Sequence, residues 1–313
     1  MLDRVNAESS LDIFNYVAYL RTRRTAMVQT EEQYTFCHDA VLEAIQCGNT
    51  QILAHDLRIT LSRMEDVDKE LKMTRFDSEF KTLNKVSPIL PKACYIVASY
   101  PENKDKNRYS DILASDFSRV VLTAIDDNEI TTYINAVHIS DFPQFWPEVG
   151  KETYDMISVE CSDERSSSVD NLRASYDQSE IAQLRFNVKD LRTPENLHKI
   201  KMFVVSGWTS EDETPPTSSI ITLIAKVERW QQQSGNGPIT VVCSDGIGRS
   251  GTFSALYSVL ERVKIEQVID VLQAIKAMRI PRPGLVKTTA EYKFIHYAVQ
   301  EYLAAFDDYA NFK

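Results

Sequence analysis

The chain has 313 residues, enough for one large domain or two modest ones. Hydrophobic residues make up 43% and charged residues 26%, an ordinary balance for a globular protein. The formal net charge of −10 argues against a nucleic-acid-binding protein, which needs a basic face. No apolar run resembles a signal peptide or a membrane span, so we expect no direct membrane insertion by this chain.

The cysteine content indicates a reducing compartment, and we expect a cytoplasmic protein. The number of cysteines is odd and no Cys-x-x-Cys pair occurs, which predicts neither a disulfide framework nor a metal site. The five histidines are scattered without the spacing of metal ligands. The five cysteines are Cys37, Cys47, Cys94, Cys161 and Cys243.

An internal repeat occurs once near each end of the chain. Residues 11–45 and 269–303 align without a gap, which argues against two helical segments that are alike by chance. Each copy predicts a helix, a loop and a second helix, and the second helix begins with a capping-box pattern at Thr30 or Thr288. The identical pairs are Asp12/Asp270, Arg21/Arg279, Arg24/Arg282, Val28/Val286, Thr30/Thr288, Tyr34/Tyr292, Phe36/Phe294 and His38/His296.

Between the two copies the pattern predicts an α/β (α+β) fold, with a twisted mixed sheet flanked by helices. The polar, serine-rich residues 162–180 predict a loop. Helices are expected at 51–64, 75–85, 217–234, 250–264 and 267–278. Strands are expected at 94–99, 118–123, 131–137, 155–160, 183–189, 201–206 and 239–242.

The segment ITVVCSDGIGRSGTF at residues 239–253 carries the clearest chemical signal. Apolar residues predict a strand, a loop of small residues runs from Cys243 to Arg249, and a helix follows. The loop amides and the helix N-terminus form a cradle for an anion, and no Lys-Ser/Thr pair follows as in a Walker A loop. We expect the anion to bind the loop residues Ser244, Asp245, Gly246, Ile247 and Gly248.

Cys243 opens this cradle and Arg249 closes it. The cradle favours a thiolate, and a guanidinium can hold two phosphoryl oxygens at once. Ser250 is placed to hydrogen-bond the sulfur and ease its later departure. The pattern predicts transfer of a phosphate monoester, with no metal or organic cofactor because the cradle supplies the positive field.

The segment resembles the signature loop of the classical protein-tyrosine phosphatases. Lys106-Asn107-Arg108-Tyr109 is similar to that family's phosphotyrosine-recognition loop, which implies that Tyr109 stacks on the substrate ring. Gly207-Trp208 resembles the hinge of the family's mobile acid loop, and MVQTEEQY resembles its glutamine loop. The resemblance covers nearly the whole chain and implies a phosphotyrosine-containing protein as substrate, cleaved through a cysteinyl-phosphate.

The positions of the two repeat copies imply an order of domains that is typical of receptor-type members of this family. It implies that residues 1–50 are the C-terminal tail of a preceding phosphatase domain, 51–74 a linker helix, and 75–306 a second, membrane-distal phosphatase domain. The preceding domain is then a partner, and the chain is the intracellular part of a single-pass membrane receptor. The stretches FDSEFKTLNKVSP and QCGNT are similar to the group with MAM-type extracellular regions (kappa, mu, rho).

Several residues depart from the family pattern. Val242 replaces a histidine that helps to hold the thiolate, and Asp245 stands where a small residue is usual, so an inward carboxylate would repel phosphate. Lys287 takes the place of the glutamine that positions water, which the first repeat keeps as Gln29. We expect Lys287 to bind phosphate but to orient water poorly.

The acid loop and the segment after Ile139 also depart from the pattern. Ser210 stands where the family has its general acid, and a serine cannot protonate a leaving tyrosyl oxygen efficiently. Glu211 and Asp212 are the candidate replacements, against the simpler interpretation that both are solvated loop acids. After about residue 140 a strand and a helix of the family are missing, so the core is less covered there.

Three functions therefore remain open. The first is a protein-tyrosine phosphatase with reduced activity, and the second is a pseudophosphatase that binds phosphotyrosine or regulates the adjacent domain. Retention of Cys243, Arg249 and Tyr109 favours phosphate binding in both cases. A sulfurtransferase is the weak third alternative, because it leaves the tyrosine loop without a purpose.

Overall fold

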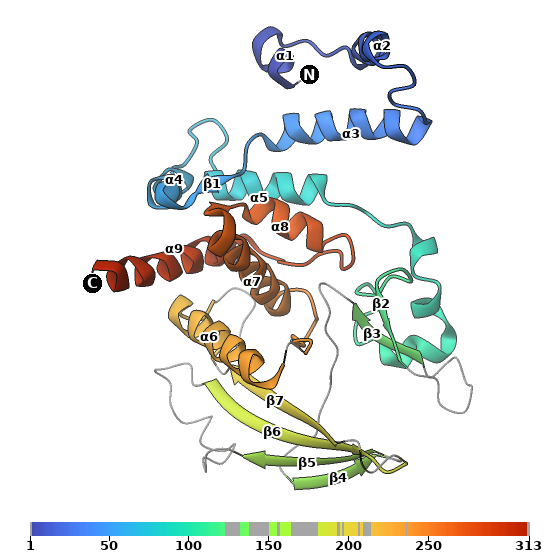
Figure 1. The fold of residues 1–313 in the computed structure, drawn as a ribbon, viewed down its shortest axis with the longest axis vertical. Coiled ribbons are helices and arrows are strands. Elements are labelled where there is room, and N and C mark those ends of the chain that lie inside the picture. The colour runs from blue at the N-terminus through green and yellow to red at the C-terminus, as the bar shows by residue number, and fades with distance from the viewer. Residues whose placement is uncertain are drawn as a thin grey trace.

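The N-terminal helices and the largest sheet lie at opposite ends of the molecule, with the other helices between them (Figure 1). The N-terminal helices are α1 (Leu2–Glu8), α2 (Ile13–Arg23) and α3 (Glu31–Cys47). The computed structural model describes residues 2–122, 132–137, 150–154, 157–163, 181–192, 195, 197–205, 207–208, 214–235 and 237–311.

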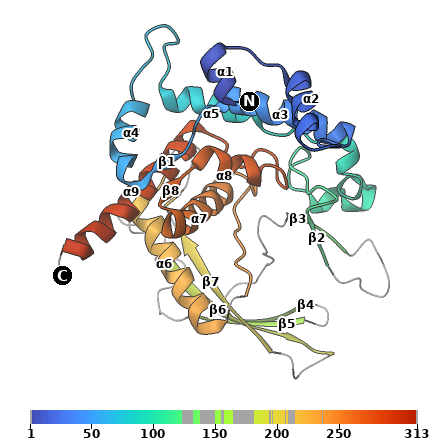
Figure 2. The same cartoon turned by 45° about the horizontal axis from the view of Figure 1, so that its top comes forward.

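The main core lies between six helices, with the largely buried α7 at its centre (Figure 2). These helices are α4 (Leu57–Met64), α5 (Arg75–Val86), α6 (Thr217–Ser234), α7 (Arg249–Glu266), α8 (Val271–Met278) and α9 (Thr289–Asn311). Of the linker helix predicted at 51–74, only α4 is α-helical, whereas Ile52–Leu53 form a strand and Ala54–Asp56 a 3₁₀ turn. Leu57, Leu61 and Met64 bury the inner face of α4 against the core. In the parts of the chain described, no helix is both long and apolar enough to cross a bilayer.

The described strands form three antiparallel sheets. The pairs are β1 (Ile52–Leu53) with β8 (Val268–Ile269), and β2 (Arg119–Val121) with β3 (Tyr133–Val137). The four-stranded sheet has the order β4 (Gly150–Tyr154), β5 (Ile157–Asp163), β6 (Ile181–Asp190), β7 (Leu197–Val205). Short 3₁₀ turns occupy Ala54–Asp56, Lys92–Cys94, Val97–Ser99 and Pro101–Lys106.

The α/β class is confirmed, but two predicted strands are wrong. Residues 94–99 form 3₁₀ turns, because the Asp116 carboxylate accepts the amide hydrogens of Ile96 and Val97 and competes with a strand ladder. Residues 239–242 belong to none of the assigned strands and line a cavity opposite β7. The predicted loop at 162–180 lies mostly outside the described residues.

The two copies of the repeat adopt the same local structure. The N-cap carboxylates of Asp12 and Asp270 each accept an amide hydrogen three residues on. Val28 and Val286 both have φ of 60°, a strained conformation for a β-branched residue. The matched arginine bonds run from Arg21 to the carbonyls of Met27 and Val28, and from Arg279 to those of Leu285 and Val286.

Candidate active site

The loop from Cys243 to Gly248 curls around the N-terminus of α7, which begins at Arg249. Gly246 has φ of +74°, a conformation that glycine adopts readily. Its N–H donates to Cys243 Sγ at 3.2 Å, and Ser250 Oγ lies 3.2 Å from the same sulfur. The structure thus brings Cys243 and Ser250 together, as the sequence predicts for a nucleophile and the hydroxyl that supports it.

The carboxylate of Asp245 faces into this loop. Its Oδ1 accepts the N–H groups of Ile247 at 3.0 Å and Gly248 at 3.1 Å, and it lies 3.2 Å from Cys243 Sγ. Burial opposes ionisation of Asp245, but the two amides, the thiol and Lys287 outweigh it and lower the pKa to about 2. Asp245 is therefore an anion inside the cradle, the orientation that the sequence analysis treated as harmful to phosphate binding.

Lys287 and Glu291 connect the cradle to the start of α9. Lys287 Nζ lies 3.1 Å from Asp245 Oδ2, and the backbone N–H of Lys287 donates to Glu291 Oε2 at 2.7 Å. Burial raises the pKa of Glu291, although the amides of Lys287 and Thr288 oppose the shift. A Cβ at Gly248 would lie 2.9 Å from Glu291 Oε1, so the loop packs directly against this capping carboxylate.

Two arginines that the sequence analysis did not assign to the site also contact the cradle. Arg108 Nη1 donates to the Ser244 carbonyl at 2.8 Å, which ties the predicted recognition loop to the cradle. Arg282 is buried, its Nη1 donates to Asn135 Oδ1 at 2.7 Å, and a Cβ at Gly246 would lie 2.9 Å from its Nη2. Burial lowers the pKa of Arg282. The repeat contained the signal for this residue, because Arg24 matches it.

The remaining predicted residues differ in how the structure places them. Tyr109 follows Arg108 and is exposed, and Val242 is also exposed beside Cys243. Glu211 and Asp212, the candidate acids, lie outside the described residues, as does Ser210.

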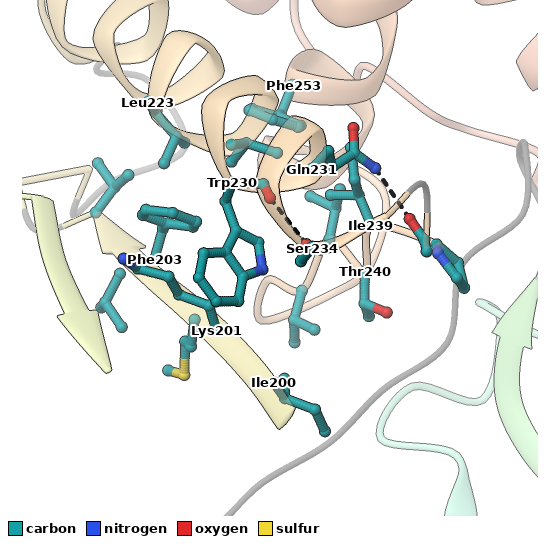
Figure 3. Close-up of a pocket in the computed structure, with 18 of the residues that line it drawn as sticks. Ile200, Lys201, Phe203, Leu223, Trp230, Gln231, Ser234, Ile239, Thr240 and Phe253 are labelled. Carbon is teal, nitrogen blue, oxygen red and sulfur yellow. Dashed lines mark hydrogen bonds between the residues drawn. The ribbon is translucent and has the colours of Figure 1, made fainter. Parts of the chain in front are cut away.

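A cavity of about 1080 Å³ opens beside the cradle (Figure 3). Cys243, Arg249 and Ser250 line one part of it. The labelled residues in Figure 3 come from β7 (Ile200, Lys201, Phe203), α6 (Leu223, Trp230, Gln231, Ser234), the extended segment after α6 (Ile239, Thr240) and α7 (Phe253). Lys201 Nζ lies 5.0 Å from the centre of the Trp230 ring, a cation–π distance. The cavity separates β7 from residues 239–242, which explains why these residues have no ladder with β7.

Gly251 sets how closely α7 approaches the loop before α9. A Cβ there would lie 2.8 Å from both the backbone N of Val286 and Leu285 Cδ2. We expect Gly251→Ala to lower the free energy of unfolding by about 2–3 kcal/mol, because overpacking displaces the loop. Urea denaturation measures this, with Gly237→Ala as control, since its nearest contact would be at 3.8 Å. Equal stability of the two variants would contradict the packing described.

Comparison with known proteins identifies the family of this chain. The family model described as "Protein-tyrosine phosphatase" matches residues 1–43, 103–144 and 139–301. The receptor-type tyrosine-protein phosphatase epsilon of Rattus norvegicus is 31% identical over 359 residues, covering 100% of this chain and 50% of the relative. The alpha form of Homo sapiens is 32% identical over 363 residues, covering 100% of this chain and 43% of the relative. The S form of Gallus gallus is 32% identical over 346 residues, covering 99% of this chain and 23% of the relative.

The chain thus spans about half the length of the epsilon relative and less of the other two. Each alignment is longer than the 313-residue chain, so the relatives carry residues that have no counterpart here. The similarity extends over all or nearly all of the chain, and the family model matches more than half of it. The chain belongs to the protein-tyrosine phosphatase family.

Proposed function

We propose that this chain is a protein-tyrosine phosphatase domain that dephosphorylates phosphotyrosine proteins with reduced activity. The observation that carries this proposal is the position of Cys243 Sγ, 3.2 Å from both the Gly246 N–H donor and Ser250 Oγ, at the N-terminus of α7. A helix N-terminus and inward amides stabilise anions, and a cysteine placed there is an effective nucleophile.

The proposed reaction has two steps. The sulfur of Cys243 attacks phosphorus, the bond from phosphorus to the tyrosyl oxygen breaks, and tyrosine leaves with a proton from Glu211 or Asp212. Arg249 and the loop amides hold the equatorial oxygens during transfer. Water then attacks the phosphorus of the cysteinyl-phosphate and gives a proton to the carboxylate that protonated tyrosine, the bond from phosphorus to sulfur breaks, and phosphate leaves. The Ser250 hydroxyl stabilises the departing sulfur. Tyr109 is the proposed ring-stacking residue.

Hydrolysis of a phosphotyrosine peptide by the wild type and by Arg249→Met tests this function. We expect the variant to lose about 10²–10³-fold in kcat/KM, because a donor aimed at the transferred phosphoryl group is removed. Arg249→Lys keeps the charge but not the bidentate geometry, and should recover only part of the loss. Turnover that is the same in all three proteins would refute the proposed role of the cradle.

The position of Asp245 favours a second candidate, a pseudophosphatase domain that binds phosphotyrosine or regulates a neighbouring phosphatase. Its carboxylate already accepts two of the loop amides, those of Ile247 and Gly248. Under this alternative the wild type binds the phosphopeptide through Arg249 without hydrolysing it. The same assay, with binding measured in parallel, separates the two candidates.

We also propose that residues 1–50 are the tail of a preceding phosphatase domain, 51–74 a connecting helical segment, and 75–306 a second phosphatase domain. Equivalent positions of the repeat support this, because Phe14 is 71% exposed whereas its match Leu272 is 1% exposed. Likewise Phe36 is 69% exposed and Phe294 is 4% exposed. The first copy thus exposes the apolar surface that the second copy buries, as expected if the preceding domain covers it.

The receptor-type relatives support a corresponding place in the cell. We propose that the chain is part of the cytoplasmic region of a single-pass membrane receptor, and that its partners are phosphotyrosine proteins and the preceding domain. The stretches FDSEFKTLNKVSP and QCGNT support assignment to the kappa, mu and rho group.

A further inference from the structure

Two departures from the family pattern, Asp245 and Lys287, meet at one point of the cradle. Asp245 Oδ1 accepts two loop amides, and Oδ2 pairs with Lys287 Nζ at 3.1 Å. The side chain of Asp245 is 9% exposed and that of Lys287 is 28% exposed, so the carboxylate is largely shielded from water and the ammonium group is partly shielded. Both carboxylate oxygens therefore have partners, the loop amides for Oδ1 and Lys287 for Oδ2.

The contacts of Asp245 are those that a bound phosphate needs. An oxyanion in this loop would accept the N–H groups of Ile247 and Gly248 and lie against Cys243 Sγ, which are the three contacts of Asp245 Oδ1. A carboxylate and a phosphate cannot share these donors, and two anions at this distance repel each other. The two ligands must therefore compete.

We propose that Asp245 and Lys287 form an internal latch in which the Asp245 carboxylate fills the phosphate site of the cradle and Lys287 holds it there. This inference deepens the proposed function, on which it rests, by assigning the two residues that limit binding of the phosphoryl group. Substrate binding requires the Asp245 side chain to leave the loop amides and to separate from Lys287.

Protonation does not open this latch near neutral pH. The pKa of Asp245 is lowered to about 2, so the carboxylate remains ionised through the physiological range. A competing anion or movement of the loop has to displace it. Two structural elements contribute to the latch, since Asp245 lies in the loop before α7 and Lys287 lies just before α9.

In the latch Lys287 binds the internal carboxylate, whereas the sequence analysis predicts that it binds phosphate. The first repeat has Gln29 at this position, and a neutral amide would hold a carboxylate more weakly than an ammonium group does. The exchange of glutamine for lysine thus fits the presence of an aspartate in the cradle.

Calorimetric titration with inorganic phosphate tests the latch in the full chain. We expect Asp245→Ala to lower the Kd for phosphate by about tenfold or more, because the loop amides no longer satisfy an internal carboxylate. Asp245→Asn removes the charge with little change in size and should shift the Kd in the same direction. Asp66→Ala removes an exposed acid that is remote in sequence from the cradle and should leave the Kd unchanged.

The same titration, applied to variants of Lys287, tests the role of this residue in the latch. Lys287→Gln should tighten phosphate binding by weakening the hold on Asp245, whereas in the Asp245→Ala background it should weaken binding or leave it unchanged. The tighter binding in the wild-type background would not occur if Lys287 were only a phosphate ligand, which would give weaker binding in both backgrounds. Thermal unfolding confirms that each variant is folded before it is titrated.

The outcomes separate the latch from the proposed function. Folded Asp245→Ala and Asp245→Asn variants with the wild-type Kd would overturn the latch. A second outcome is that Asp245→Ala binds phosphate more tightly than the wild type while adding Arg249→Met has no effect on the Kd. This result would support Asp245 as an anion that competes with phosphate, but it would refute the proposed phosphatase function of the cradle. Tighter binding that depends on Arg249 supports both.

Discussion

Replacing Cys243 by serine should reduce hydrolysis of a phosphotyrosine peptide by about 10⁴-fold or more, because removal of a nucleophile eliminates the covalent route. The serine hydroxyl can still donate to Asp245 and contact Ser250, so the loop should keep its shape. Initial rates with purified wild type and variant measure the loss, and peptide binding should change little.

Cys94→Ser is the matched control for this prediction. Cys94 is also a free, half-buried cysteine, but it lies at the end of a 3₁₀ turn and is not among the contacts of the cradle. Its replacement should leave the rate unchanged. A Cys243→Ser variant that hydrolyses the peptide at the wild-type rate would exclude a cysteinyl-phosphate and with it the proposed chemistry.

Arg279→Met should lower the free energy of unfolding by about 3–5 kcal/mol, because it leaves buried hydrogen-bond acceptors without a partner. Arg279 is buried and donates to the carbonyls of Leu285 and Val286 and to the side chains of Asn84 and Ser87. Burial lowers its pKa to about 10, so it remains charged at neutral pH. Chemical denaturation followed by fluorescence measures the effect.

The repeat provides an internal control for this substitution. Arg21 donates to the carbonyls of Met27 and Val28 in the same geometry but is exposed. Arg21→Met should therefore cost about 1 kcal/mol or less, because water can replace the lost donor. An equal decrease in the free energy of unfolding for the two variants would contradict the difference in burial between the two copies.

Local signals in the sequence were sufficient to predict most helices. The apolar spacing in 75–85 and 217–234 predicted α5 and α6, and α6 ends where Gly235 has φ of 80°. The gapless register of the repeat paired residues that make the same caps and arginine bonds in both copies, although the sequence analysis predicted only the caps at Thr30 and Thr288. These features depend on neighbours within a few residues, which a single sequence displays directly.

Features that depend on distant residues could not be predicted in the same way. Apolar residues at 239–242 have strand character, but a strand also needs an adjacent ladder, which β7 does not provide across the cavity. The composition of the cradle loop identified Cys243 and Arg249. The inward Asp245 carboxylate contacts Lys287, which is distant in sequence, so the sequence alone could not show which way this side chain points.

One position of the repeat also contributes to the cradle. Arg282 packs against Gly246 of the cradle, and its match with Arg24 had already marked it as part of a recurring loop. Arg108 lies within the segment that resembles a recognition loop, yet its bond to the Ser244 carbonyl joins segments far apart in the chain. Such contacts appear only when the fold brings those segments together.

Mass spectrometry of the chain during reaction with a phosphotyrosine peptide tests the central claim most directly. Rapid acid quenching followed by proteolysis should yield the peptide containing Cys243 with one added phosphoryl group, absent from Cys243→Ser and increased in Asp245→Ala. Phosphate transfer to Cys243 would show that the cradle performs the proposed first step. Peptide that is bound or hydrolysed without any phosphoryl group on Cys243, in the wild type and in Asp245→Ala, would contradict the account.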